Sequence, residues 1–168
     1  MDVADSFSIT ILTQDDVAEY RSIRLEALAK EPSAFASRTD DWIGLAPKKW
    51  RQKLSNPVFV ARFEGEPVAM MGLSPMRPSK MSHRANLVGV YVRERFRGRG
   101  VGSLLFTAIG SFARKAGVSQ LELTVSALNT PAICFYNRHG FKPVGRIPNA
   151  LLDHGSAIDL LMMVCQLP

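Results

Sequence analysis

A short segment rich in arginine and glycine carries the clearest chemical signal in the sequence. Between an apolar run and an amphipathic stretch, it reads Arg97-Gly98-Arg99-Gly100-Val101-Gly102-Ser103. Its three glycines lack a Cβ atom, so several backbone N–H groups can point toward one concave spot. A helix beginning there would add partial positive charge, and the two arginines add formal charge. The segment therefore predicts an anion site suited to a pyrophosphate.

The elements on either side of this segment must position it. Residues 86–92 are apolar on both alternating faces, which predicts a strand in the centre of a sheet. Over residues 101–116, apolar side chains recur at helical spacing. A second strand over residues 118–125 and a second helix follow, with Asn129 or Thr130 as the N-cap. The succession of strand, helix, strand and helix predicts two parallel strands joined by a right-handed crossover.

The rest of the chain predicts further elements around this pair. Residues 7–12 alternate in polarity as a strand does, and Thr13 with Asp16 resembles a capping box that opens a helix to about Lys30. Turn residues and apolar runs predict a short helix from Pro47, a hairpin of residues 58–63 and 67–73, and a closing strand over residues 159–166.

Two other kinds of phosphate loop are excluded by the residues present. The segment has no Gly-Lys-Ser or Gly-Lys-Thr, which a P-loop needs to place a lysine and a magnesium ligand. A dinucleotide site requires an acidic residue about 20 positions after its glycines, at the carboxyl end of the next strand. Glu122 has about that spacing but lies early in its strand. Neither a nucleotide hydrolase nor a dinucleotide-dependent oxidoreductase is predicted.

Composition sets the broad class of protein. The chain has 168 residues, 46% of them hydrophobic, and a net charge of +6, which fits a single domain over residues 1–168. No window approaches the roughly 18 apolar residues of a membrane span, and the first residues lack the order of a signal peptide. A cytoplasmic protein with no membrane partner is therefore expected. Cys134 and Cys165 lack partners at ligand spacing, so neither a metal site nor a disulfide is expected.

The two motifs and their order resemble those of the GCN5-related N-acetyltransferases, the GNAT family. The cofactor motif of that family is Arg or Gln, two residues, Gly, one residue, then Gly or Ala, and residues 97–102 match it after a strand. A second motif of the family matches Asn129, Ala132, Phe135-Tyr136 and Gly140-Phe141. The resemblance extends from the first strand to the last and is that of a small bacterial-type member.

This resemblance implies an α/β fold of the α+β kind, with a mixed, mainly antiparallel sheet flanked by helices. Its two central parallel strands, residues 87–92 and 118–125, would splay apart at their ends. The resemblance also implies acetyl-CoA as the cosubstrate, without a metal. The pantetheine arm would pair with the backbone of Val90, Tyr91 and Val92, and the pyrophosphate would meet residues 97–103.

Roles in the reaction follow from the same resemblance. The backbone N–H near Val90 would polarise the thioester carbonyl. Tyr136 would protonate the departing thiolate, the alternative being a role as a core aromatic residue. Asn129 would bond the pantetheine arm, cap its helix, or do both.

The general base is where the sequence departs from well-studied members. A lysine-like amine with a pKa of about 10.4 is mostly protonated at pH 7, so the site must help remove a proton. The positions that carry Glu in relatives hold Asn86 and Thr124 here. Glu122, on the same strand face as Thr124, is the candidate base acting through water, and His83 is a second candidate. Both residues also fit ordinary surface positions, and a third possibility is an amine that binds already neutral.

The acceptor pocket, by the same resemblance, lies among the first two helices with their loop, the end of the hairpin and a loop of residues 148–157. Large apolar side chains from these segments would form either its floor or part of the core: Phe35, Trp42, Trp50, Met70 and Met71. The polar residues nearest its mouth, to which no catalytic role is assigned, are Asp153, His154 and Asp159.

The sequence thus predicts an enzyme that transfers the acetyl group of acetyl-CoA to a primary amine by direct attack in a ternary complex. The acceptor, a small molecule or a peptide, is not identified, and a monomer or a homodimer is expected. One alternative is an acyl-CoA-binding sensor without catalysis, against which Tyr136 argues. The other is a nucleic-acid-binding domain using the basic residues between Arg77 and Arg99, against which their interleaving with glycine argues.

Overall fold

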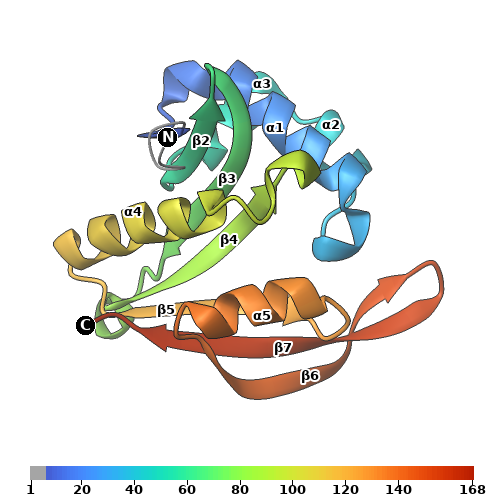
Figure 1. The fold of residues 1–168 in the computed structure, drawn as a ribbon. Coiled ribbons are helices and arrows are strands. Elements are labelled where there is room, and N and C mark those ends of the chain that lie inside the picture. The colour runs from blue at the N-terminus through green and yellow to red at the C-terminus, as the bar shows by residue number, and fades with distance from the viewer. Residues whose placement is uncertain (1–6) are drawn as a thin grey trace.

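A seven-stranded mixed sheet with helices on both faces organises residues 7–168, the part of the chain that the computed structural model describes (Figure 1). The strand order is β1-β2-β3-β4-β5-β7-β6. The strands are β1 (Phe7–Ile11), β2 (Val58–Phe63), β3 (Glu66–Pro75), β4 (Arg84–Val92), β5 (Gln120–Ser126), β6 (Lys142–Asp153) and β7 (Ser156–Gln166). The α-helices are α1 (Val17–Lys30), α2 (Asp40–Ile43), α3 (Pro47–Lys53), α4 (Val101–Lys115) and α5 (Thr130–Arg138). The predicted fold class is confirmed.

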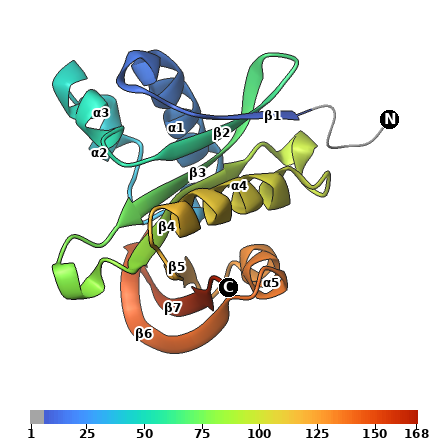
Figure 2. The same ribbon diagram turned by 90° about the vertical axis from the view of Figure 1, so that its left-hand side faces the viewer.

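Both faces of the sheet are covered because its inner strands are apolar on both faces. In β2, Phe59 and Ala61 belong to the core cluster that includes α4, while Val58 and Val60 belong to the cluster that includes α1 and α3. This assignment follows the two-residue period of a strand. Figure 2 shows α1 and α3 on one side of β1–β4 and α4 on the other.

The capping box predicted at the start of the first helix is present. The Asp16 carboxylate accepts hydrogen bonds from the Thr13 backbone N–H at 2.7 Å and from the Thr13 hydroxyl at 2.8 Å. The first turn is a 3-10 turn, η2 (Gln14–Asp16), and the α-helix proper begins at Val17. The capping box satisfies backbone N–H groups that have no acceptor at the start of a helix, and it fixes where the chain turns from β1 into α1.

The two central strands are parallel and part after a short paired region. β4 and β5 pair only at Arg84↔Gln120, Ala85↔Leu121 and Asn86↔Glu122. Beyond these pairs β4 runs on to Val92 and β5 to Ser126, and the ribbons diverge (Figure 1). A gap between unpaired strand edges therefore opens in the middle of the sheet.

One prediction about the C-terminal part was wrong. Residues 148–157, expected as a loop, form the end of the β6–β7 hairpin, because β6 reaches Asp153 and β7 begins at Ser156. The connecting residues His154 and Gly155 have positive φ angles of 46° and 81°, as the tightest hairpin turns require. The pairing slips between Pro143 and Gly145 and again between Ile147 and Leu151. These irregularities and the prolines interrupt the alternation by which strands are recognised.

Candidate active site

A bulge in β4 lies beside the gap between the central strands. Met70 faces Tyr91 and Gly72 faces Val88, so the single residue between them on β3 is opposed by two on β4, Gly89 and Val90. Gly89 has a φ angle of +60°, which a residue with a side chain rarely adopts. Bulges of this kind bend a strand and leave the extra residue unpaired. Val90 thus has no register partner on β3 or on β5.

The glycine-rich loop has the backbone conformation of an anion nest. It follows the 3-10 turn η5 (Glu94–Phe96) and leads directly into α4. Gly98 and Gly100 have φ angles of +72° and +78°, and Gly100 is the N-cap of α4. The first helical hydrogen bond runs from Leu104 N to the Gly100 carbonyl at 3.0 Å. The N–H groups of residues 101–103 therefore have no acceptor within the helix and are available to an anion.

The two arginines of this loop have partners within the protein. Arg97 donates from Nε to the Val92 carbonyl at 3.0 Å and forms an ion pair with Glu31 at the end of α1. The Arg99 guanidinium lies 5.5 Å from the ring centroid of Phe96. The backbone of the loop is therefore free for a phosphate, while both guanidinium groups would have to share or exchange their present contacts to bind one.

The loop also packs closely against α5. A Cβ atom at Gly102 would lie 3.0 Å from the Phe135 ring, so any side chain here would push that ring away from α4. The Nδ1–H of His139 donates to the Phe135 carbonyl at 2.8 Å, which leaves Nε2 to accept from the Ser103 hydroxyl at 3.0 Å. Ser103 and Gly102 thus hold the start of α4 against the helix that carries the second motif.

The second motif places Asn129 and Tyr136 on α5. The Asn129 side chain accepts from Ala132 N at 3.2 Å, so of its two predicted roles the capping role is observed. Tyr136 is 7% exposed, and its ring lies among aromatic residues, 5.5 Å from Phe135 and 5.6 Å from Phe141 between centroids. Burial raises the pKa of Tyr136 to about 12. The phenol is therefore protonated at neutral pH and can act only as a proton donor.

Tyr91, predicted among the cofactor-binding residues, directs its side chain elsewhere. Its hydroxyl donates to Glu26 of α1 at 2.9 Å, and Arg93 donates to the same carboxylate at 2.7 and 2.8 Å. Burial and the Glu26 carboxylate raise the pKa of Tyr91. Only the backbone of Tyr91 remains for a ligand. No local pattern predicts this network, because Glu26 lies 65 positions away from Tyr91.

Glu122, the predicted base, is held in an ion pair at the point where β4 and β5 part. Arg84 donates to it from Nε and, at 2.8 Å, from Nη2, and Gln120 donates at 2.8 Å. The hydrogen bonds from Arg84 lower the pKa of Glu122 more than its burial raises it. A carboxylate with a lowered pKa is a weak proton acceptor. This environment favours a structural role for Glu122 and argues against its prediction as the base.

We expect Glu122→Gln to lower stability rather than turnover. Because the folded-state pKa is depressed, the ion pair stabilises the protein at pH 7, and this contribution is lost as the pH falls through the folded pKa. The variant should unfold at lower denaturant concentration at pH 7, by roughly 1 to 2 kcal/mol, and the difference should shrink toward pH 3. Urea titrations at both pH values measure this. A fall in kcat of more than about 100-fold, with unchanged stability, would instead restore Glu122 as the base.

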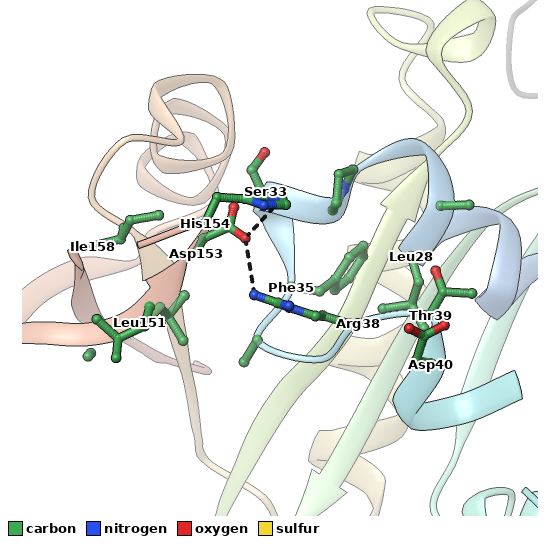
Figure 3. A pocket seen from close by; sticks show the side chains of 15 residues that line it. Leu28, Ser33, Phe35, Arg38, Thr39, Asp40, Leu151, Asp153, His154 and Ile158 are labelled. Carbon is green, nitrogen blue, oxygen red and sulfur yellow. Dashed lines mark ion pairs between the residues drawn. The ribbon is translucent and has the colours of Figure 1, made fainter. Parts of the chain in front are cut away.

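A cavity of about 410 Å³ opens between the segment after α1 and the tip of the β6–β7 hairpin (Figure 3). Arg38 Nη2 lies 3.8 Å from Asp153 Oδ1 across the cavity, and His154 Nε2 lies 3.7 Å from the same oxygen. The other residues that line the cavity and are labelled in Figure 3 are Leu28, Ser33, Phe35, Thr39, Asp40, Leu151 and Ile158. The predicted acceptor region therefore contains a cavity, walled by a hairpin where a loop was expected.

The predicted floor of that pocket lies mostly in the core. Phe35 lines the cavity, but Trp50, Met70 and Met71 are at most 1% exposed and belong to the core clusters. Trp42 packs on Trp50 with ring centroids 5.4 Å apart. Of the polar residues expected at the mouth, Asp153 and His154 are present, while Asp159 binds Arg146 and the backbone N–H of Asn149.

Two further observations concern membranes and metals. None of the helices within residues 7–168 is long and apolar enough to cross a membrane. Over the same residues, His, Cys, Asp and Glu side chains do not gather in groups of three that would hold a metal ion.

Comparisons with known proteins agree on one family. The model of the Acetyltransferase (GNAT) family matches residues 19–141. The chain is 27% identical over 139 residues to the uncharacterized N-acetyltransferase MJ1207 of Methanocaldococcus jannaschii, covering 82% of this chain and 61% of that protein. It is 29% identical over 119 residues to the L-amino acid N-acetyltransferase AaaT of Escherichia coli, covering 68% and 73%. The chain thus spans less than two thirds of the first of these relatives.

Solved structures share the fold over nearly the whole chain. An acetyltransferase of the GNAT family from Streptococcus pneumoniae superposes with a TM-score of 0.83 and 21% identity, covering 96% of this chain and 99% of that one. The putative acetyltransferase yncA of Salmonella typhimurium, solved with its cofactor acetyl-CoA, has a TM-score of 0.78 and 22% identity, covering 96% and 94%.

Proposed function

Because the chain belongs to the GNAT acetyltransferase family, we propose that it transfers the acetyl group of acetyl-CoA to a primary amine. The observation that carries this proposal is the alignment of two features along one path. The unpaired edge of β4 ends at Val92, whose carbonyl accepts from Arg97 of the glycine-rich loop at 3.0 Å, and the backbone of that loop has the conformation of an anion nest. A substrate with an extended arm and a pyrophosphate fits such a path, because strand edges bind amides and nests bind phosphates.

In this proposal the backbone does most of the binding. The pantetheine arm runs along the unpaired edge of β4 at Val90–Val92, and the pyrophosphate meets Gly98, Gly100 and the first N–H groups of α4. Asn129, at the start of α5, faces the arm from the β5 side while capping its helix. Arg97 and Arg99 supply positive charge around the loop.

The reaction proposed is a direct attack of a neutral amine on the thioester carbon in a ternary complex. The Val90 N–H donates to the carbonyl oxygen as it gains negative charge. When the intermediate collapses, the C–S bond breaks, the sulfur takes a proton from Tyr136, and the proton that the attacking nitrogen releases returns through water to the tyrosinate. Since Glu122 is engaged by Arg84, the amine loses its proton to water or binds already neutral.

The acceptor proposed is a small molecule. Relatives that match the chain are named for small substrates, among them L-amino acid N-acetyltransferase AaaT and an L-methionine sulfoximine/L-methionine sulfone acetyltransferase of Pseudomonas aeruginosa. A nucleic-acid partner is not proposed, because three arginines of the basic cluster, Arg84, Arg93 and Arg97, already bind carboxylates.

The proposal is tested by binding and by turnover. We expect calorimetry to show acetyl-CoA binding, and a thiol-release assay to show coenzyme A produced when amines are supplied. Binding without turnover on any amine would favour the sensor, and absence of acetyl-CoA binding by the folded protein would reject both. Amine-independent thiol release would indicate a hydrolase.

A further inference from the structure

Arg24 is a buried arginine without an acidic partner among residues 7–168. It lies on α1 and is 7% exposed, and its Nε and Nη1 atoms have no hydrogen-bond partner within the described chain. Two arginines that reach α1 from the sheet do have acidic partners, since Arg62 binds Glu19 and Arg93 binds Glu26. Both of those carboxylates are therefore occupied by other cations.

Arg24 lies among apolar neighbours and packs its guanidinium against two aromatic rings. The neighbouring buried residues of α1 are mostly apolar: Tyr20, Ile23, Ala27 and Leu28. The Arg24 guanidinium carbon lies 4.7 Å from the Phe35 ring centroid and 4.4 Å from that of Trp42. These rings attract the cation but accept no conventional hydrogen bond. Burial lowers the pKa of Arg24, which means that the surroundings disfavour its charge. Because the rings leave the Nε and Nη1 donors of this buried cation without hydrogen bonds, the guanidinium is a candidate site for an anion.

The guanidinium lies behind the wall of the cavity and beside the reacting strand. Phe35, which contacts it, lines the cavity, and so does Leu28, one helical turn along α1. On the other side, Arg24 Nη1 lies 3.7 Å from the position that a Cβ atom at Gly89 would take. Gly89 is in the bulge next to Val90, whose N–H is proposed to face the thioester. An anion on Arg24 would therefore lie between the acceptor cavity and the reaction centre.

The charges around the cavity favour a singly charged anion. Arg38 is paired with Asp153 across the cavity, and Asp40 adds a second carboxylate to its wall. A dianionic phosphate would be repelled by these acids, whereas an ammonium group would be attracted. An unpaired guanidinium behind Phe35, together with the Asp40 carboxylate in the cavity wall, suits a molecule that carries one carboxylate and one amine.

We propose that Arg24 binds the carboxylate of the acceptor and that the acceptor is a free α-amino acid. This inference rests on the proposed function and adds to it the substrate class and the residue that selects it. In an α-amino acid the carboxylate and the amine share one carbon, so a carboxylate held at Arg24 leaves the amine beside the β4 bulge. Phe35 and Trp42 lie outside the sheet, on the segment after α1, and displacement of their rings would admit the carboxylate.

The test compares free amino acids with their amides. Initial rates with acetyl-CoA are measured for the common L-amino acids and for the primary amide of each, using the wild type, Arg24→Met and Arg62→Met. We expect the wild type to favour at least one acid over its amide by about 100-fold in kcat/KM. Arg24→Met should remove that preference by raising KM for the acid about 100-fold, with the amide changed less than about 3-fold. Arg62→Met, which removes an arginine paired with Glu19, should keep the preference.

Stability separates a binding role from a structural one. Since Arg24→Met replaces an unpaired buried cation by an apolar chain, its melting temperature should be no lower than that of the wild type. A marked loss of stability, or equal loss of activity on acids and amides, would overturn the inference. Equal use of acids and amides by the wild type, or no acetylation of any amino acid, would overturn it while acetyl-CoA binding and turnover of other amines still supported the proposed function.

Arg24 would equally bind a carboxylate carried by the acyl group of the donor. If Arg24 bound the donor, the wild type would use succinyl-CoA in preference to acetyl-CoA, and Arg24→Met would reverse that order. That result would reject the assignment of Arg24 to the acceptor. We expect instead that acetyl-CoA is preferred by both proteins.

Discussion

Gly100→Asp is expected to weaken acetyl-CoA binding by at least about 100-fold while the protein stays folded. A carboxylate about 4 Å from a phosphate, at an effective dielectric constant of about 20, costs about 4 kcal/mol for each pair of charges. That energy corresponds to nearly 1000-fold in affinity. The side chain itself has room, because no atom lies within 4 Å of a Cβ atom built at Gly100. Its φ angle of +78° is one that Asp and Asn tolerate better than most residues.

Gly100→Asn is the matched control for this substitution. It adds nearly the same bulk and the same backbone strain without the charge, so we expect a loss in affinity of less than about 10-fold. Calorimetric titration of both variants with acetyl-CoA, together with their melting temperatures, measures the difference. Unchanged affinity in a folded Gly100→Asp protein would show that the pyrophosphate binds elsewhere.

Tyr136→Phe is expected to slow turnover by roughly 10- to 1000-fold and to leave acetyl-CoA affinity nearly unchanged. Only the hydroxyl is removed, and the ring contacts with Phe135 and Phe141 remain. With a pKa raised to about 12 by burial, the phenol is a weak acid. Proton transfer to a thiolate whose conjugate acid has a pKa near 8.5 would then be uphill by about 5 kcal/mol. A thiolate buried in the same site is also poorly solvated, which raises its own pKa and reduces the difference.

The pH dependence gives a second measurement for Tyr136. The protonated phenol is the active form, so it stays competent below its pKa of about 12 and loses its proton only above that value. A fall in kcat between pH 8 and pH 10 would therefore belong to another group. The single-turnover rate of Tyr136→Phe decides its role: full turnover where chemistry is rate-limiting would make Tyr136 a packing residue, with the thiolate protonated by water.

The parts of the fold that the sequence predicts correctly are those encoded by neighbouring residues. The Thr13–Asp16 capping box, the glycine-rich turn and the Asn129 cap all act within four positions along the chain, and the structure contains each of them. Long apolar runs likewise located β2–β5. These signals are local, so periodicity and capping residues were enough to find them.

The parts that the sequence does not predict depend on contacts between distant residues. Arg97 meets Glu31 across 66 positions, and Arg84 meets Glu122 across 38. Each contact changes what the residue can do, since an arginine already paired is less available to a phosphate and a carboxylate already paired is a weaker base. The lack of hydrogen-bond partners for Arg24 could not be predicted either, because it depends on all the residues that surround the side chain in the fold.

The parting of β4 and β5 bears on whether another polypeptide can pair with the open strand edges. Unpaired strand edges are templates on which other chains can add a strand, and here two such edges lie in the middle of a sheet. Because the edges converge at Asn86 and Glu122, the opening is a wedge. A strand placed between them would need a constant spacing of about 4.8 Å to each neighbour, which a wedge cannot offer. A thin arm with only a few amide groups has no such requirement, so the shape that admits the proposed substrate also keeps out polypeptide.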